Sequence, residues 1–332
     1  MLQNEQHYNS VKYFIDPRFD SAKPFKEGLA PVLIDTLWGF INKEGTIAVK
    51  PQFTQAEHFN EGYAKVEITY LYSFIDKEGN LIAKPEFSWA HNFSEGLAAV
   101  EYNRKWGYID CNGNFLIEPC FNDAKSFSEN LAAVSLKGNY GFIDKNGNIA
   151  ITPEYEDAGM FSEGMAPVKK KNKWGYINKH GQMVVSAEYK AADIFKEGFA
   201  KVEIESRQLM IFSKYLHGFI NKEGEEVINL KYSSASAFSE GLAPVAVDYK
   251  WGYIDRKNNL IIKPQYNYAD MFSESLACIN FQGKYGFIDL EGLTIIDTVI
   301  SDATAFSEGL AAIQLDFMGK WGYIIKPQAY IN

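Results

Sequence analysis

The sequence has few of the residues that build disulfide frameworks or structural zinc sites. It contains three cysteines, Cys111, Cys120 and Cys278, and no Cys-x-x-Cys pair. An odd number without that spacing argues against a disulfide framework and against a zinc site. No histidine recurs beside a cysteine, so we expect no catalytic thiol. Cys278 is expected in packing and Cys111 at an exposed hairpin.

Long apolar runs are also missing. No stretch approaches the ~20 uninterrupted apolar residues that a membrane helix needs. The segment from Met1 to His7 has neither a basic region nor an apolar run, so it does not resemble a secretory signal. We therefore expect a cytoplasmic protein without membrane contact.

Clustered positive charge is scarce. The formal net charge is -9, from 33 basic and 42 acidic residues. Nucleic-acid binding needs grouped basic side chains that displace counterions, and only Lys169 to Lys171, with Lys173 nearby, qualify. A solvated loop explains that group, so we expect no nucleic-acid partner. The acidic surface indicates solubility, with some bias toward basic partners.

Catalytic constellations are absent from the sequence pattern. The histidines have no metal-ligand spacing, and no Ser/His/Asp set or phosphate-cradling glycine loop can be proposed. We therefore expect no catalytic, metal-binding or cofactor-binding residues, no cofactor and no enzymatic activity. The five histidines are His7, His58, His91, His180 and His217.

A repeat fills the chain instead. The unit contains Phe93-Ser94-Glu95-Gly96-Leu97-Ala98-Ala99-Val100, followed by Trp106-Gly107-Tyr108-Ile109-Asp110. Successive copies begin 34 residues apart, except for one step of 43. A fixed period of this size is typical of solenoids and propellers. The first aromatic residues of the nine copies are Phe25, Phe59, Phe93, Phe127, Phe161, Phe195, Phe238, Phe272 and Phe306.

Each unit predicts three or four short antiparallel strands and no long helix. β-branched and aromatic runs alternate with Gly, Asn and Pro punctuation, as in Asn112-Gly113 and Asn146-Gly147. Alternation places Trp106 and Tyr108 on one face of their strand and Gly107 and Ile109 on the other. Both faces are apolar, so neighbouring units must cover them, and we expect the glycine to leave room for a ring of the next unit.

These motifs resemble the WG repeat family, also called KWG repeats. Lys105 to Asp110, Lys173 to Asn178 and Lys250 to Asp255 match its Lys-Trp-Gly-Tyr-Ile-Asp pattern, and the likeness covers roughly residues 11 to 327. The resemblance implies a bacterial repeat protein and an architecture, and it contributes no catalytic residues. The sequence departs from the pattern at Ser73, Asn130, Ala187, Leu230, Asn258 and Ser275.

The fold class is therefore all-β, with one array of nine units over residues 11–332 and a disordered start over residues 1–10. Units 1–4 and 5–8 form two similar blocks, and unit 9 resembles unit 1. The chain begins with the tail of a unit and ends with the head of one. A ring that closes by sharing one blade between the chain ends needs this offset. We favour a β-propeller-like ring, and an open twisted β-solenoid is the alternative.

A glutamate recurs after every Phe-x pair. Its simplest role is to accept hydrogen bonds from backbone N–H groups at the turn beside the following Gly. A ring of carboxylates that attracts cations along an axial channel is the alternative. The nine positions are Glu27, Glu61, Glu95, Glu129, Glu163, Glu197, Glu240, Glu274 and Glu308.

The candidate site is the place where the repeat breaks. The connection from Val202 to Gly218 in unit six is nine residues longer than its counterparts. Binding sites on repeat scaffolds gather in loops that vary, although drift in a tolerant loop is also compatible with the sequence. We expect a non-catalytic scaffold that binds a protein or peptide, with multivalent glycan binding as the alternative. The candidate partner-binding residues are Arg207, Met210, Phe212, Lys214, Tyr215 and His217.

Overall fold

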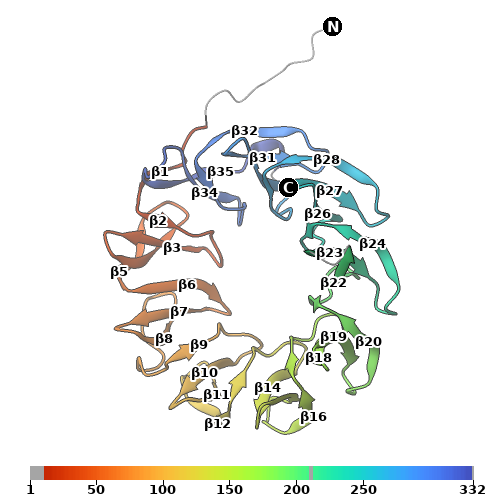
Figure 1. Cartoon of the computed structure of the whole chain (residues 1–332). Helices are drawn as coiled ribbons and strands as arrows, with labels where there is room; N and C mark the ends of the chain where they lie inside the picture. Colours follow the sequence, from red (N-terminus) through yellow and green to blue (C-terminus); the bar gives the residue numbers. More distant parts are fainter. Residues whose placement is uncertain (1–10, 209–211, 331–332) are drawn as a thin grey trace.

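Nine small antiparallel sheets surround a common axis and form a closed β-propeller (Figure 1). The computed structural model describes residues 11–208 and 212–330. Within them the strands form eight four-stranded sheets and one three-stranded sheet. The favoured ring is confirmed, and the open solenoid is wrong. The expected disorder of residues 1–10 lies outside the described residues.

Each blade begins with a short strand at the inner edge of the ring and continues outward. The innermost strands are β2 (Ser21–Ala22), β6 (Gln55–Asn60), β9 (Trp89–Ala90), β13 (Asp123–Ala124), β17 (Asp157–Ala158), β21 (Ala191–Ala192), β25 (Ser234–Ala235), β29 (Tyr268–Ala269) and β33 (Asp302–Ala303). The second strands are β3 (Leu29–Ile34), β7 (Tyr63–Ile68), β10 (Ala98–Tyr102), β14 (Ala132–Leu136), β18 (Met165–Lys170), β22 (Ala200–Gln208), β26 (Leu242–Val247), β30 (Leu276–Phe281) and β34 (Leu310–Gln314).

The third strand of each blade carries the position of the Trp-Gly motif, and in every blade except the three-stranded blade 2 a fourth strand lies on the outer rim (Figure 1). The third strands are β4 (Leu37–Asn42), β8 (Leu71–Ile75), β11 (Lys105–Ile109), β15 (Asn139–Ile143), β19 (Lys173–Asn178), β23 (Phe212–Ile220), β27 (Lys250–Asp255), β31 (Lys284–Asp289) and β35 (Trp321–Ile325). The outer strands are β5 (Ile47–Phe53), β12 (Phe115–Phe121), β16 (Ile149–Tyr155), β20 (Met183–Tyr189), β24 (Glu226–Tyr232), β28 (Leu260–Tyr266), β32 (Thr294–Ile300) and β1 (Ile15–Phe19).

The ring closes in blade 9, where both ends of the chain meet. β1 pairs with β35, with Ile15 opposite Tyr323 and Phe19 opposite Trp321. The N-terminal strand therefore serves as the outer strand of the last blade, as the offset in the sequence predicts. Closure thus pairs the edge of β35 with a strand from the other end of the chain. A 3₁₀ helix, η2 (Gln328–Tyr330), follows β35.

One aromatic pair joins every blade to the next. The Tyr or Phe after the Trp-Gly dipeptide packs against the first Phe of the following Phe-x-Glu motif, with ring centroids 4.8 to 5.0 Å apart, in tilted or edge-to-face arrangements. The seam repeats this contact, because Tyr323 packs against Phe25. Such pairs contribute about 0.5–1.5 kcal/mol beyond the area that they bury. The core is thus a circle of equivalent interfaces.

The structure requires a glycine in the Trp-Gly motif for a different reason from the one that the sequence predicts. A Cβ on Gly107 would lie 2.5 Å from the carbonyl oxygen of Ile117 in the outer strand of the same blade. The expectation that a ring of the next unit fills the space is wrong. The outer strand shifts register beside the glycine, which lets the two backbones approach closely.

The two faces of the ring carry different connections. One face holds the Glu-Gly turns, such as Glu27–Gly28, and the turns between third and outer strands, such as Lys43–Gly45. We call it the turn face. We call the opposite face, with the hairpins between second and third strands, the tip face. β3 runs between the two, since Leu29 follows Gly28 and Ile34 precedes the tip.

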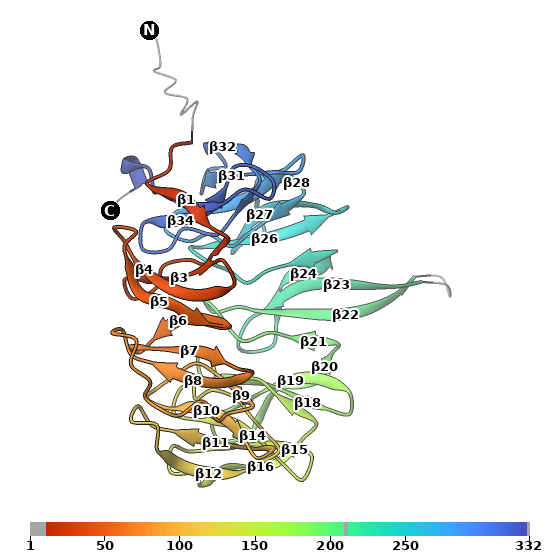
Figure 2. The same cartoon turned by 90° about the vertical axis from the view of Figure 1, so that its left-hand side faces the viewer.

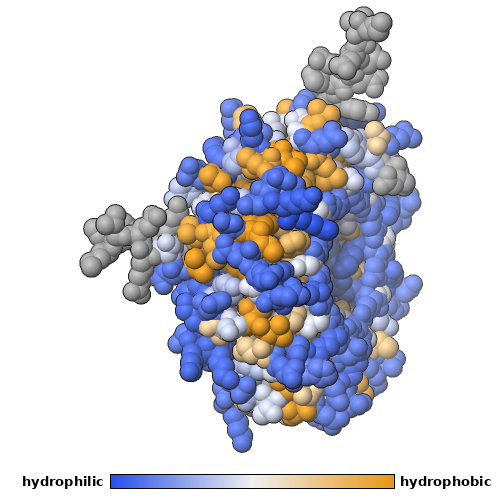
Figure 3. Space-filling view, turned by 90° about the vertical axis from the view of Figure 1, so that its right-hand side faces the viewer, coloured by the Kyte–Doolittle hydropathy of each residue, from blue (hydrophilic) through white to orange (hydrophobic). Residues whose placement is uncertain are grey.

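The outer rim presents aliphatic side chains between polar stripes (Figure 3). Val184, Leu260 and Ile261 are 43 to 49% exposed on β20 and β28. Equivalent positions recur from blade to blade, so these side chains follow from the repeat. Among residues 11–208 and 212–330, no helix has the length and apolarity needed to cross a lipid bilayer.

Candidate functional site

The turn face is held by the repeated glutamates. Each carboxylate accepts a hydrogen bond from the backbone N–H of the next blade, as Glu27 does from Gly62 at 2.9 Å. The last one closes the circle, since Glu308 accepts from Gly28 at 3.0 Å. The predicted acceptor role is confirmed, but the donor belongs to the neighbouring blade. The carboxylates therefore act as bonds between blades.

Lysine and arginine side chains from the turns after the third strands form ion pairs with most of these carboxylates. Lys43 lies 3.0 Å from Glu308, and Lys179 lies 3.0 Å from Glu129. Seven of the nine glutamates have such a Lys or Arg partner within the described residues. The exceptions are Glu61 and Glu240, because Cys111 and Leu290 occupy the corresponding cation positions. Paired carboxylates do not form the open cation-attracting ring that the sequence left as an alternative.

The tip face carries exposed aromatic side chains in strained turns. Tyr70 and Tyr249 are each 88% exposed, and Phe317 and Met318 are 82% and 85% exposed. Tyr70 and Tyr249 have positive φ angles of 69° and 62°, and Thr69 has 49°. Bulky and β-branched residues rarely adopt this region without a functional or structural reason. The tip face is therefore where this chain departs most from an ideal repeat.

The long connection of blade 6 lies on the same face. It is a continuous hairpin, because β22 and β23 pair from Ala200 opposite Ile220 to Gln208 opposite Phe212. The hairpin extends well beyond the neighbouring strands along the ring axis (Figure 2). The segment predicted as a loop is thus an arm of paired strands that continues the sheet of blade 6.

The candidate residues distribute along this arm. Arg207 pairs with Ser213 in the ladder, Lys214 with Ser206, and Phe212 begins β23. Tyr215 is 44% exposed. Met210 lies outside the described residues. The arm therefore brings several of the predicted residues together, and their role in binding stays a prediction.

His217 lies at the base of the arm. Its Nε2 atom is 3.6 Å from Glu203, and its Nδ1 atom is buried without a hydrogen-bond partner in the described chain. Burial lowers the pKa of His217 and outweighs the opposing effect of Glu203. The imidazole is therefore neutral near pH 7, and the contact with Glu203 is not a permanent ion pair.

A pocket opens beside the base of the arm. It has a volume of about 340 Å³, and we call it the Trp174 pocket. Apolar side chains and the Trp174 ring make most of its surface, and Asp193 and Lys196 supply the charges. Its lining comes from the inner parts of blades 5 to 8: Gly159, Pro167, Trp174, Ala192, Asp193, Ile194, Lys196, Ala237 and Met271.

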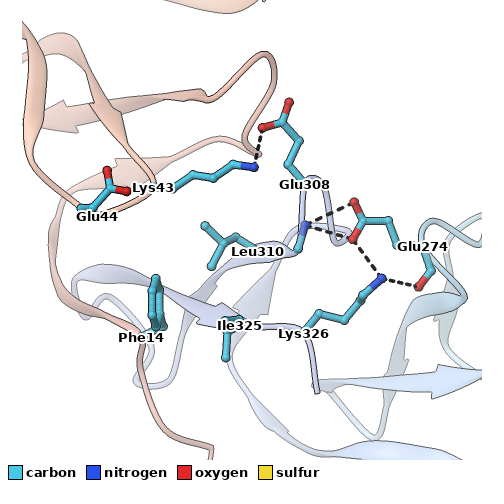
Figure 4. A pocket seen from close by; sticks show the side chains of 9 residues that line it. Phe14, Lys43, Glu44, Glu274, Glu308, Leu310, Ile325 and Lys326 are labelled. Carbon is cyan, nitrogen blue, oxygen red and sulfur yellow. Dashed lines mark hydrogen bonds and ion pairs between the residues drawn. The ribbon is translucent and has the colours of Figure 1, made fainter. Parts of the chain in front are cut away.

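A second pocket lies on the turn face at the closure of the ring (Figure 4). It has a volume of about 430 Å³, and we call it the seam pocket. Phe14, Leu310 and Ile325 form its apolar surface, and the Lys43–Glu308 and Lys326–Glu274 ion pairs lie at its edge. Blade 9 lacks the turn that links third and outer strands elsewhere, because its outer strand comes from the other end of the chain.

The sequence reasoning missed both pockets, although each has a signal. Ile325 occupies a position that is Asp or Asn in the other eight units, where the side chain caps the turn, as Asp110 does for Asn114. Gly159 occupies a position that carries a side chain in every other unit. The sequence shows both departures from the repeat, but only the structure shows that a pocket lies beside each of them.

The cysteines and acidic groups show no clustered chemistry in the described chain. Cys111 and Cys120 are exposed, Cys278 is buried, and all three are free thiols. Burial raises the pKa of Cys278. Residues 11–208 and 212–330 contain no group of three or more His, Cys, Asp or Glu side chains that could hold a metal ion.

Comparison with known proteins identifies the repeat and the fold. The family model described as WG containing repeat matches residues 12–35, 38–72, 72–106, 106–140, 140–174, 174–207, 218–251, 251–285 and 285–321. None of the curated proteins compared with this chain is detectably similar to it.

Solved structures resemble the chain in shape. A crystal structure of the eukaryotic initiation factor matches with a TM-score of 0.61 at 11% identity, covering 95% of this chain and 92% of that chain. Dihydro-heme d1 dehydrogenase NirN in complex with DHE matches with a TM-score of 0.49 at 12% identity, covering 94% of this chain and 76% of that chain. At such identities the likeness shows the fold alone, and the second match carries no argument.

Proposed function

Because this chain belongs to the family of WG-containing repeat proteins, we propose that it is a non-catalytic β-propeller scaffold that binds a protein or peptide through its tip face. The observation that carries the proposal is the β22–β23 arm, which projects past a face where the other blades close with short hairpins. Variable loops on a rigid scaffold are the usual place for recognition. We keep the cytoplasm as the expected compartment.

The side chains of the tip face support this role. Tyr70, Tyr249, Phe317 and Met318 expose large apolar surfaces without a covering element. Tyrosine gives contact area at a low cost in conformational entropy, and aromatic residues are enriched at protein interfaces. Retaining them in turns that prefer glycine is compatible with a selected binding role.

The test compares arm variants in affinity capture with quantified partners. Residues 205–215 are replaced by Asn-Gly, which leaves Ile204 opposite Leu216 beside a two-residue turn, as Ile34 and Leu37 lie in blade 1. We expect a partner captured by the wild-type chain to be lost or strongly depleted. The matched control, Lys137→Asn, gives the tip of blade 4 the same Asn-Gly turn and should retain the partner. A partner list unaffected by the arm replacement contradicts the proposal.

Multivalent glycan binding is the second candidate. The observation in its favour is Trp89, which is 48% exposed on the inner strand of blade 3. Equivalent sites in many blades require equivalent open rings, but Lys23 lies over Trp38 and His91 stacks on Trp106. The support is thus confined to single positions. A glycan array without signal removes this candidate.

A further inference from the structure

In each blade, one residue directly follows the first two residues of the innermost strand, as Lys23 follows the two residues of β2. This residue corresponds to a position near the first ring of the Trp-Gly motif of the same blade, which is Trp38 in blade 1. In three blades a cationic or aromatic side chain covers that ring. Lys23 Nζ lies 5.1 Å from the Trp38 centroid, Lys125 Nζ lies 5.8 Å from that of Tyr140, and the His91 ring stacks on Trp106 at 5.2 Å. The nine residues at this position are Lys23, Glu57, His91, Lys125, Gly159, Asp193, Ser236, Asp270 and Thr304.

Blade 1 shows how a lysine is held at this position. The Lys23 ammonium lies over Trp38, donates a hydrogen bond to the carbonyl oxygen of Ala56 at 2.9 Å, and pairs with Glu57 at 3.0 Å. The last two residues belong to blade 2. An aromatic face, a carbonyl oxygen and a carboxylate thus satisfy one ammonium group.

The boundary of blades 5 and 6 repeats these partners without the lysine. Four repeats further along the chain, Trp174, Ala192 and Asp193 occupy the positions of Trp38, Ala56 and Glu57. All three line the Trp174 pocket. The residue that corresponds to Lys23 is Gly159, and no Lys or Arg nitrogen of the described chain is found over the Trp174 ring. The pocket therefore repeats the partners of the Lys23 ammonium without a lysine over its ring, while Lys201 pairs with Asp193 from the side of β22.

The rest of the pocket suits the alkyl part of a lysine. Ile194, Ala237 and Met271 give it an apolar wall. The volume of about 340 Å³ is ample for one lysine side chain. A Cβ on Gly159 would lie 2.6 Å from Cγ of Pro167, so the glycine lets the Pro167 ring pack closely against the backbone at this edge of the pocket.

We propose that the Trp174 pocket binds a lysine side chain of a partner protein, with the ammonium over Trp174 and against Asp193 and the carbonyl oxygen of Ala192. This inference rests on the proposed function and deepens it, because it names the side chain that the partner presents. The pocket adjoins the arm through β21, since Ala192 pairs with Val202 of β22. The net charge of -9 favours a basic partner.

Two lysines of the chain lie near the proposed site and repel a second ammonium group. Lys201 Nζ lies 3.0 Å from the Asp193 carboxylate, so a bound lysine would share that carboxylate with Lys201. Lys196 lines the pocket itself. The position of Lys196 is Asn60 in blade 2. A lysine side chain alone should therefore bind weakly, with the surrounding contacts of the partner adding affinity.

The experiment titrates the full chain with N-acetyl-lysine methylamide as the probe. Trp fluorescence and chemical-shift changes of the Trp indole signals measure binding. The control probe is N-acetyl-norleucine methylamide, which keeps the alkyl chain and lacks the charge. We expect saturable binding of the lysine probe at one site and at least tenfold weaker binding of the control.

Variants assign the site. Asp193→Asn should weaken probe binding about tenfold, and Trp174→Leu should remove it. Lys196→Asn should tighten it by removing the opposing charge. Lys23→Gly copies the blade 5 arrangement into blade 1 and should raise the stoichiometry from one probe to two. Circular dichroism establishes that each variant is folded, and Asp193, which is partly exposed, can change without a packing defect.

Three results would overturn the proposal: no saturable binding to the wild-type chain, equal binding of the norleucine control, or unchanged affinity in the folded Asp193→Asn variant. The probe needs only the pocket, so its failure leaves the arm-dependent capture of a partner untouched. Failure of the arm replacement to affect capture, with probe binding intact, rejects the proposed function instead.

Discussion

The turn face and the tip face are built from the same nine units, yet they differ in regularity. On the turn face, one carboxylate bond passes from blade to blade around the whole circle, including the seam from Glu308 to Gly28. On the tip face, neighbouring hairpins differ in length, charge and exposure. Tyr249 in blade 7 is 88% exposed, whereas blade 4 ends in Lys137-Gly138.

The difference shows which positions the ring constrains. A residue that bonds to the next blade has a counterpart to satisfy in every unit, so changing one copy leaves a donor without its acceptor. A hairpin tip has no such neighbour and is free to vary. Regularity on one face therefore marks stability, and irregularity on the other is where we look for recognition.

The largest expected effect concerns the aromatic contacts between blades. Phe127→Ala should lower the free energy of unfolding by about 3–5 kcal/mol, because it opens a cavity at a buried ring pair with Tyr108. Urea unfolding measures the loss. Tyr249→Ala is the tip-face control and should change stability by less than about 0.5 kcal/mol. Equal losses in the two variants would contradict the contrast between the faces.

The carboxylate circle should give the next largest effect. Glu129→Ala removes the acceptor of Gly164 and the partner of Lys179, and should cost about 1–3 kcal/mol of unfolding free energy. Burial by itself would raise the pKa of Glu129, but Lys179 and the Gly164 N–H outweigh it and hold the pKa below the ordinary 4.5.

The sign of its pH dependence follows from that shift. A carboxyl whose pKa is depressed by folding contributes stability that is full above its unfolded value and is lost as the pH falls through the folded value. The difference between wild type and Glu129→Ala should therefore be constant above about pH 5 and shrink below pH 4.5. A gap that widens on acidification would refute this role for the carboxylate.

Relief of strain on the tip face should produce a smaller change of opposite sign. Replacing Thr69 and Tyr70 by Asn and Gly suits a turn with positive φ at both residues, and should raise stability by about 1 kcal/mol. Thermal unfolding measures the gain, and capture of the partner should weaken in parallel. A stabilised variant that binds its partner as well as wild type would remove Tyr70 from the interface.

The smallest effect is expected where the turn face lacks a cation. Cys111→Lys supplies the partner that Glu61 does not have, and should add about 0.2–1 kcal/mol at low salt. High salt should erase the gain, because the pair is exposed. The melting temperature in the two salt conditions provides the measurement, with Cys111→Met as the uncharged control. A salt-independent gain would indicate packing instead.

Much of the fold was readable from the sequence because its information is periodic. The spacing of Phe25, Phe59 and their counterparts gave the nine blades, and the displaced tail and head gave the shared blade. The direction of the Glu bonds was not readable. A carboxylate beside a glycine suggests a local turn, and only the packing of adjacent blades brings Glu27 to Gly62.

The candidate site was predictable only in part, for a similar reason. The extra residues of unit six mark the arm, but the polar run Glu205-Ser206-Arg207-Gln208 lacks the alternation of a strand, so the sequence predicts a loop where the structure has paired strands. Gly159 was visible as a missing side chain. That its absence uncovers Trp174 beside Asp193 depends on contacts between blades, which a comparison of units in one dimension does not contain.

The closure of blade 9 means that the polypeptide has no privileged starting point. Because β1 completes a sheet made by the opposite end of the chain, joining the two ends and cutting at the Lys137-Gly138 hairpin should yield a permuted chain with the same nine interfaces. In such a permutant, blade 4 would become the shared blade, and the break would move from the turn face, where β35 ends and β1 begins, to a tip-face hairpin outside the β22–β23 arm.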